Sequence, residues 1–109
     1  MPRKQKLMTQ EIKDHFAKVP FGSTDGLPED QQKVVLKLFN PTGAGTWYIL
    51  EFDGEDTMYG LCCIQEKELG YVSLSELDSF VGRFGLGIER DIHWDPNTTM
   101  ADVRAGKKS

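Results

Sequence analysis

The stretch TWYILEFDGEDTMYGLCCI, residues 46–64, decides the fold. It contains two runs rich in aromatic and β-branched residues, separated by the short polar tip DGED. Such runs around an Asp-Gly pair are typical of a β-hairpin. Pairing the runs across a four-residue loop sets Leu50 beside Tyr59 on the face expected to form the core. A competing turn at Asp53–Gly54 keeps the same assignment of faces.

The opposite face of this hairpin is also mostly apolar, with one carboxylate, Glu51, among its side chains. Its members are Trp47, Ile49, Glu51, Met58, Gly60, Cys62 and Ile64. A face of this kind must be covered by a helix or a loop, or form a binding surface. We expect helices to cover it, and Glu51 is the residue on it without an evident structural reason.

Two amphipathic segments supply those helices. The first is predicted over 9–18, where Thr9 is a suitable N-cap and an apolar stripe recurs at helical spacing. The second is predicted over 74–81, because Ser73 and Glu76 have the spacing of a capping box and Gly82 suits the C-terminal cap.

Alternating patterns predict two more strands, over 33–39 and 88–94. The fold class is therefore α+β: one small domain, with an antiparallel sheet of three to five strands and two helices packed on it. We expect the domain to span 7–96, between a basic flexible N-terminal tail at 1–6 and a flexible C-terminal tail at 97–109.

The charge of the chain is unevenly distributed. The net charge is −4, but residues 7–103 hold all 17 acidic residues and only seven of the 13 basic ones, which gives 7 − 17 = −10. Lysine and arginine supply most nucleic-acid affinity, so direct nucleic-acid binding by this body is not expected. An acidic body could instead mimic DNA, as a counter-defence protein does. No apolar run is long enough for a membrane span and no secretion signal is visible, so we expect a cytoplasmic protein.

Six carboxylates form the candidate site. They are Glu51, Asp53, Glu55, Asp56, Glu89 and Asp91. Glu51 and Asp53 are two residues apart, as are Glu89 and Asp91, and this spacing places both carboxylates of a pair on one side of a strand. If the two strands were close, the two pairs could converge on Mg²⁺ or Mn²⁺ in a hydrolase-like enzyme. The plainer interpretation is a solvated hairpin tip that serves as a binding surface. No catalytic residue, metal ligand or cofactor is assigned, because signature motifs for these are absent.

Three motifs in order carry a family resemblance: TWYILEFDGEDTMYGLCC, ELGYVSLSEL and GLGIERDIHW. Over about residues 7–96 they resemble domain-of-unknown-function family 2958, uncharacterised small proteins. The resemblance implies a bacterial or phage origin, often on plasmids and other mobile elements, and no established activity. Together with the charge pattern, it favours a small non-enzymatic binding or regulatory protein. Such a protein would act through contacts between its acidic surface and an unidentified protein partner, with its oligomeric state open.

Overall fold

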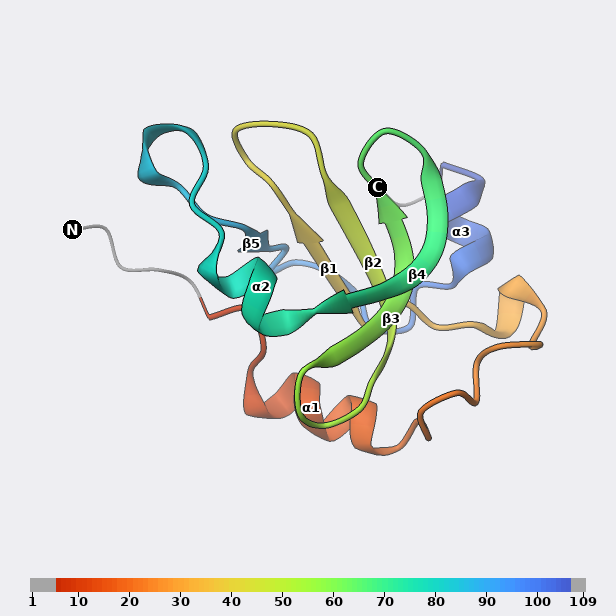
Figure 1. The fold of residues 1–109 in the computed structure, drawn as a ribbon. Coiled ribbons are helices and arrows are strands. Elements are labelled where there is room, and N and C mark those ends of the chain that lie inside the picture. The colour runs from red at the N-terminus through yellow and green to blue at the C-terminus, as the bar shows by residue number, and fades with distance from the viewer. Residues whose placement is uncertain (1–5, 107–109) are drawn as a thin grey trace.

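Five antiparallel strands form one sheet in the computed structural model, which describes residues 6–106 (Figure 1). The strands are β1 (Leu36–Phe39), β2 (Thr46–Phe52), β3 (Thr57–Cys63), β4 (Lys67–Ser73) and β5 (Glu89–Arg90). The helices are α1 (Gln10–Ala17), α2 (Leu74–Ser79) and α3 (Met100–Arg104), with 3-10 turns at Glu29–Gln31 and Arg83–Gly85. The order across the sheet is β4-β3-β2-β1-β5, so β1 to β4 form a meander and β5 returns to the outer edge of β1. The predicted α+β class is confirmed.

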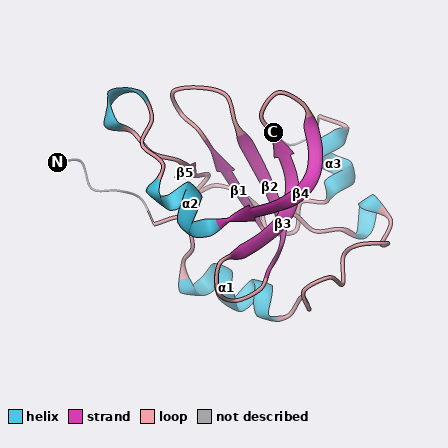
Figure 2. Cartoon of the chain, viewed as in Figure 1, coloured by secondary structure: helices cyan, strands magenta, loops and turns pink. Residues whose placement is uncertain are grey.

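Helices cover both faces of the sheet (Figure 2). Trp47 and Ile49 point to the face that α1 and α2 cover, where the Phe16 and Phe52 rings lie 6.0 Å apart. Tyr48 points to the other face, where Met100 and Val103 of α3 complete a second core cluster. None of the helices within residues 6–106 is long and apolar enough to cross a lipid bilayer.

Both predicted helix starts are confirmed. The Thr9 hydroxyl accepts the N–H of Ile12 at 3.2 Å, and the Ser73 hydroxyl accepts the N–H of Glu76 at 3.3 Å. The second helix ends at Ser79, two residues before the predicted end, because the backbone at Phe80 is extended (φ −63°, ψ 134°). The prediction that Gly82 caps this helix is therefore wrong.

A β-bulge at Leu50 changes the predicted hairpin register. Up to Ile49 the register is regular, but Leu50 has no partner on β3, so Glu51 pairs with Tyr59 and Phe52 pairs with Met58. The predicted Leu50–Tyr59 pair is wrong. Because one extra residue moves the following side chains to the other face, Glu51 leaves the α1 face and Phe52 joins it.

Gly60 explains how β2 and β3 approach each other beside this bulge. A Cβ atom at Gly60 would lie 2.0 Å from the main-chain oxygen of Tyr48 and 2.8 Å from Cα of Ile49. The glycine therefore makes room for the backbone of the neighbouring strand.

The last strand is shorter than predicted. The predicted strand over 88–94 is only β5, since Asp91 begins a turn: its Oδ1 accepts the His93 N–H at 3.0 Å, and its carbonyl accepts the Trp94 N–H at 3.3 Å. The turn sends Ile88 and Trp94 to opposite faces of the sheet.

Two elements were not predicted. One is β4, which pairs along its whole length with β3. The other is α3, within the segment assigned to a flexible tail: Met100 is fully buried, and Thr99 and Asp102 form a reciprocal capping box. Residues 97–106 are thus part of the folded body, while residues 1–5 and 107–109 lie outside the described residues.

Candidate binding surface

Glu51 is the most deeply buried carboxylate of the predicted site, with an exposed fraction of 1%. Its Oε1 accepts the Gly22 N–H at 2.6 Å, and its Oε2 accepts the Thr24 N–H at 2.8 Å as well as the Thr24 hydroxyl. A buried carboxylate is tolerated only when such donors replace its hydration. Glu51 is therefore the anchor of the loop between α1 and β1, which resolves why an acid lies in the middle of this apolar hairpin.

Gln32 continues the same polar network. Its Nε2 donates to the carbonyl oxygens of Thr24 at 3.1 Å and Leu27 at 3.0 Å. The loop over 21–30 is thus fastened at three of its residues from inside the protein. Its polar composition indicates a mobile connection, but its hydrogen bonds indicate an ordered one.

Asp53 is used within the hairpin tip. Its Oδ1 accepts the N–H groups of Glu55, Asp56 and Thr57 at 2.8, 2.9 and 3.1 Å. These hydrogen bonds, that of Glu55 foremost, lower the pKa of Asp53. Glu55 remains exposed at the tip.

Asp56 ties the hairpin to the start of α2. It accepts the Ser73 hydroxyl at 2.5 Å, the Ser75 N–H at 2.7 Å and the Ser75 hydroxyl at 3.2 Å. The Ser73 bond and then the Ser75 N–H bond lower the pKa of Asp56. The main-chain oxygen of Asp56 also accepts the Leu74 N–H at 2.8 Å. Asp56 therefore stabilises the helix start.

Asp91 faces a lysine held among aromatic rings. Its Oδ2 lies 3.9 Å from Nζ of Lys37, whose side chain is 14% exposed. That ammonium lies 5.6 Å from the ring centroid of Trp94 and 6.0 Å from those of Tyr48 and Phe39, within cation–π range. Asp91 thus balances a largely buried charge.

The predicted pair Glu51 and Asp53 does not converge with the pair Glu89 and Asp91. Glu89 pairs with Phe39 on β1, which pairs with Thr46 at the start of β2, whereas Glu51 lies near the other end of β2. One whole strand and most of the length of β2 separate them. Within residues 6–106, no group of three or more His, Cys, Asp or Glu side chains is placed to hold a metal ion.

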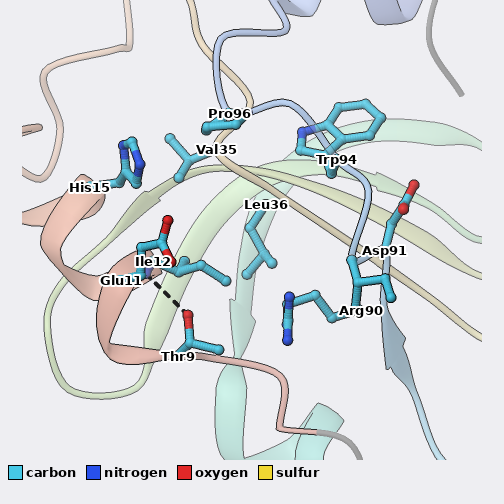
Figure 3. Close-up of a pocket in the computed structure, with 11 residues that line it drawn as sticks. Thr9, Glu11, Ile12, His15, Val35, Leu36, Arg90, Asp91, Trp94 and Pro96 are labelled. Carbon is cyan, nitrogen blue, oxygen red and sulfur yellow. Dashed lines mark hydrogen bonds between the residues drawn. The ribbon is translucent and has the colours of Figure 1, made fainter.

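A hollow of about 290 Å³ opens between α1 and the segment after β5 (Figure 3). Glu11 and His15 of α1 lie on one side, Leu36 forms part of the floor, and Arg90 extends from β5 toward the start of α1. Nε of Arg90 donates to the main-chain oxygen of Lys6 at 3.1 Å. Opposite charges line this hollow, so it has no strong preference for ligands of one charge.

Exposed apolar side chains concentrate in the chain around β5, mostly in the loop that precedes it. Ten large hydrophobic residues are exposed among residues 6–106, and five of them lie within 80–92. We call residues 80–92 the contact segment. Its exposed apolar members are Phe80, Val81, Phe84 and Leu86 in the loop before β5, and Ile92, which lines the hollow after β5. Single exposed apolar residues are ordinary, whereas such a concentration marks an interaction site.

Phe84 lies at the tip of this segment and is 88% exposed. Its backbone is left-handed (φ 58°, ψ 21°), and Gly85 follows at φ 72°. The Gly82 N–H donates to the Leu86 carbonyl at 2.7 Å and closes the loop beneath it. This loop lies beside the turn between β1 and β2, since a Cβ at Gly82 would be 3.2 Å from Oγ1 of Thr42 (Figure 1).

The sequence patterns used to predict the strands and helices assign this loop to neither, and they did not identify its exposed residues. The signal is present in FVGRFGLG, residues 80–87, where four large apolar residues alternate with glycines. Three glycines within residues 82–87 disfavour a regular strand or helix, and a loop of this length cannot bury all its own apolar side chains. That combination predicts exposed apolar groups.

The fold and this surface define a small α+β protein with a five-stranded antiparallel sheet and an apolar loop beside its last strand. The chain belongs to the family described as "Protein of unknown function (DUF2958)", whose family model matches residues 7–106. No curated protein and no solved structure matches the chain.

Proposed function

We propose that this protein is a non-enzymatic binding module that docks its contact segment into an apolar groove of a partner protein. The exposure of Phe84 in a left-handed backbone carries the proposal. The left-handed region costs a bulky L-residue about 1–2 kcal/mol. Burial of a phenylalanine in a partner returns about 1.5–3 kcal/mol. Aromatic residues presented in this way are common binding hot spots.

The charge around the segment indicates the chemistry of the partner. Within residues 80–92 two arginines balance Glu89 and Asp91, so the segment itself is neutral, while the body over 7–103 carries −10. This charge opposes association with an anionic membrane or with DNA. It favours a protein groove with a basic rim, because complementary charges raise the association rate and exclude other partners.

The proposal keeps Glu89 at the working surface and reassigns most of the other carboxylates predicted from the sequence. Glu51, Asp53 and Asp56 already accept hydrogen bonds within the protein, and Asp91 accepts the His93 N–H and pairs with Lys37. We include in the same proposal a regulatory role in the cytoplasm of a bacterium that carries a mobile element. The family resemblance and the acidic composition support that setting.

Site-specific photo-cross-linking in bacterial cells tests the docking. A benzoylphenylalanine at position 84 should cross-link one protein species, and the same group at the exposed position 64 should not. Phe84→Asn keeps a residue that tolerates the left-handed backbone, so it should retain stability while weakening binding to the captured species at least tenfold. Ile64→Asn, at a side chain 57% exposed in the β3–β4 turn, is the matched control. Identical cross-links at both positions, or none at 84, would contradict the proposal.

A further inference from the structure

The two edges of the sheet differ in how they are protected. At one edge β5 is only two residues long and is ended by the Asp91 turn. At the other edge β4 is seven residues long, has no proline, and pairs with β3 without a bulge. The outer backbone groups of β4 have no hydrogen-bond partner among the described residues. Proteins normally blunt a long edge strand because its free N–H and C=O groups attract another strand.

We propose that β4 is a dimerisation edge, at which a second copy of this chain adds its own β4 in antiparallel orientation. If a twofold axis perpendicular to the sheet relates the two copies, one residue of β4 lies opposite the same residue of the second copy. Gly70 is the middle residue of β4, so only the register with Gly70 on the axis pairs all seven residues. In that register Leu69 of each copy lies opposite Tyr71 of the other. The two sheets then join into one continuous sheet, a recognition mode known as β-augmentation.

Apolar side chains support this register. Leu69 and Tyr71 are 44% and 68% exposed and lie on the same face of β4, because they are two residues apart. The Tyr71 ring already packs at a tilt against two others, with its centroid 5.0 Å from that of Tyr59 and 6.0 Å from that of Phe21. In the dimer, Leu69 of the second copy would extend this cluster across the axis. Cross-strand apolar pairs of this kind stabilise sheets.

A local pair of opposite charges favours a second copy in this register, against the net negative charge that both copies share. In the Gly70-centred register Lys67 lies opposite Ser73 of the second copy. The Ser73 hydroxyl donates to Oδ2 of Asp56 at 2.5 Å, so the residue opposite Lys67 is in contact with a carboxylate. Lys67 is exposed, and its side chain can reach that carboxylate. The symmetry makes this ion pair twice, at the two ends of the same interface.

A cysteine scan tests the register directly. Opposed residues of an antiparallel pair have Cα atoms roughly 4.5–5.5 Å apart, which is within the range of disulfides. In a chain carrying Cys62→Ala and Cys63→Ala, Gly70→Cys should cross-link the dimer under mild oxidation. The position accepts a side chain, because nothing lies within 4 Å of a Cβ there. Glu68→Cys, on the same face, is the control, since residue 68 faces residue 72 of the second copy.

Light scattering on the unmodified chain gives the second test. The mass should rise from 12.3 kDa toward twice that value with concentration. Lys67→Glu should raise the dimer dissociation constant about tenfold, because it breaks two exposed ion pairs and adds repulsion, while Lys18→Glu, at the exposed residue that follows α1, should not. A monomer throughout a range of about 10–500 μM, or equal cross-linking at 70 and 68, would overturn the proposal.

Discussion

Replacement of Glu51 by glutamine should release the loop over 21–30 and destabilise the protein. The carboxylate offers two oxygens to three donors: the N–H groups of Gly22 and Thr24 and the Thr24 hydroxyl. An amide has only one oxygen. If it stays with Thr24, its NH₂ group is turned toward the Gly22 N–H, which now lies 2.6 Å from the carboxylate oxygen. Donor then faces donor, and this hydrogen bond is lost.

The expected loss of unfolding free energy is about 2–3 kcal/mol. A hydrogen bond to a charged group contributes about 1.5–3 kcal/mol, and the remaining two weaken when the acceptor becomes neutral. The lower cost of burying an amide offsets part of this loss. For a domain of this size such a change lowers the melting temperature by roughly 10 °C or more. Thr24→Val, which removes only the hydroxyl donor, should cost less, about 1 kcal/mol.

Urea unfolding at pH 7 and amide hydrogen exchange measure the two parts of this prediction. Glu55→Gln is the matched control, because it makes the same chemical change at the exposed hairpin tip and should alter stability by less than about 0.5 kcal/mol. Exchange at Gly22 and Thr24 should rise in Glu51→Gln and stay unchanged in Glu55→Gln. Equal stability of the two variants, with protected amides at 22 and 24, would refute the assigned role of Glu51.

Three further predictions follow from individual contacts. Gly60→Ala should cost more than about 3 kcal/mol in urea unfolding, since its Cβ would lie 2.0 Å from a main-chain oxygen of β2; a loss below 1 kcal/mol would exclude the close approach. The pKa values of Asp53 and Asp56 are lowered in the folded state, so both stabilise the fold above the ordinary aspartate pKa, and this contribution is lost as the pH falls below about 4. Asp53→Asn with Asp56→Asn should flatten the melting temperature between about pH 5 and 2.5, and an unchanged slope would contradict this. Burial raises the pKa of the Cys62 thiol, and a further rise comes from Cys63, so iodoacetamide should label Cys62 slowly at pH 7.5 until the protein is unfolded.

The helix caps and the hairpin could be predicted from the sequence, because they depend on residues close together in the chain. Thr9 and Ser73 cap helices because the cap needs only a hydroxyl and the next turn of the same segment. The hairpin likewise follows from two apolar runs around one polar tip. These features involve contacts a few residues apart, which a sequence pattern encodes directly.

The end of β5 and the helix α3 could not be predicted in this way, because they depend on contacts with residues distant in the sequence. The strand at 88–94 alternates as a strand should, but Asp91 instead makes a turn that places Trp94 against Val34, 60 residues earlier, where its indole Nε1 donates to the Val34 carbonyl at 2.7 Å. α3 is five residues long and amphipathic only over Met100 and Val103, so its pattern is too short to predict a helix. Its stability comes from burial against the sheet rather than from helix propensity.

The bulge at Leu50 decides to which face of the sheet Glu51 and Phe52 point. A regular hairpin would direct Glu51 to the α1 face, which is apolar, and would leave its charge without donors. The extra residue turns Glu51 to the other side, where the loop from 21 to 30 supplies its hydrogen bonds, and turns Phe52 toward Phe16. Both residues therefore reach suitable surroundings through one irregularity. Deletion of Leu50 removes the extra residue but still leaves Glu51 opposite Tyr59 and Phe52 opposite Met58, so both side chains should keep their faces. In urea unfolding the deletion should therefore cost about as much as Leu50→Ala, which removes the same buried side chain, and a far larger loss for the deletion would contradict this account of the bulge.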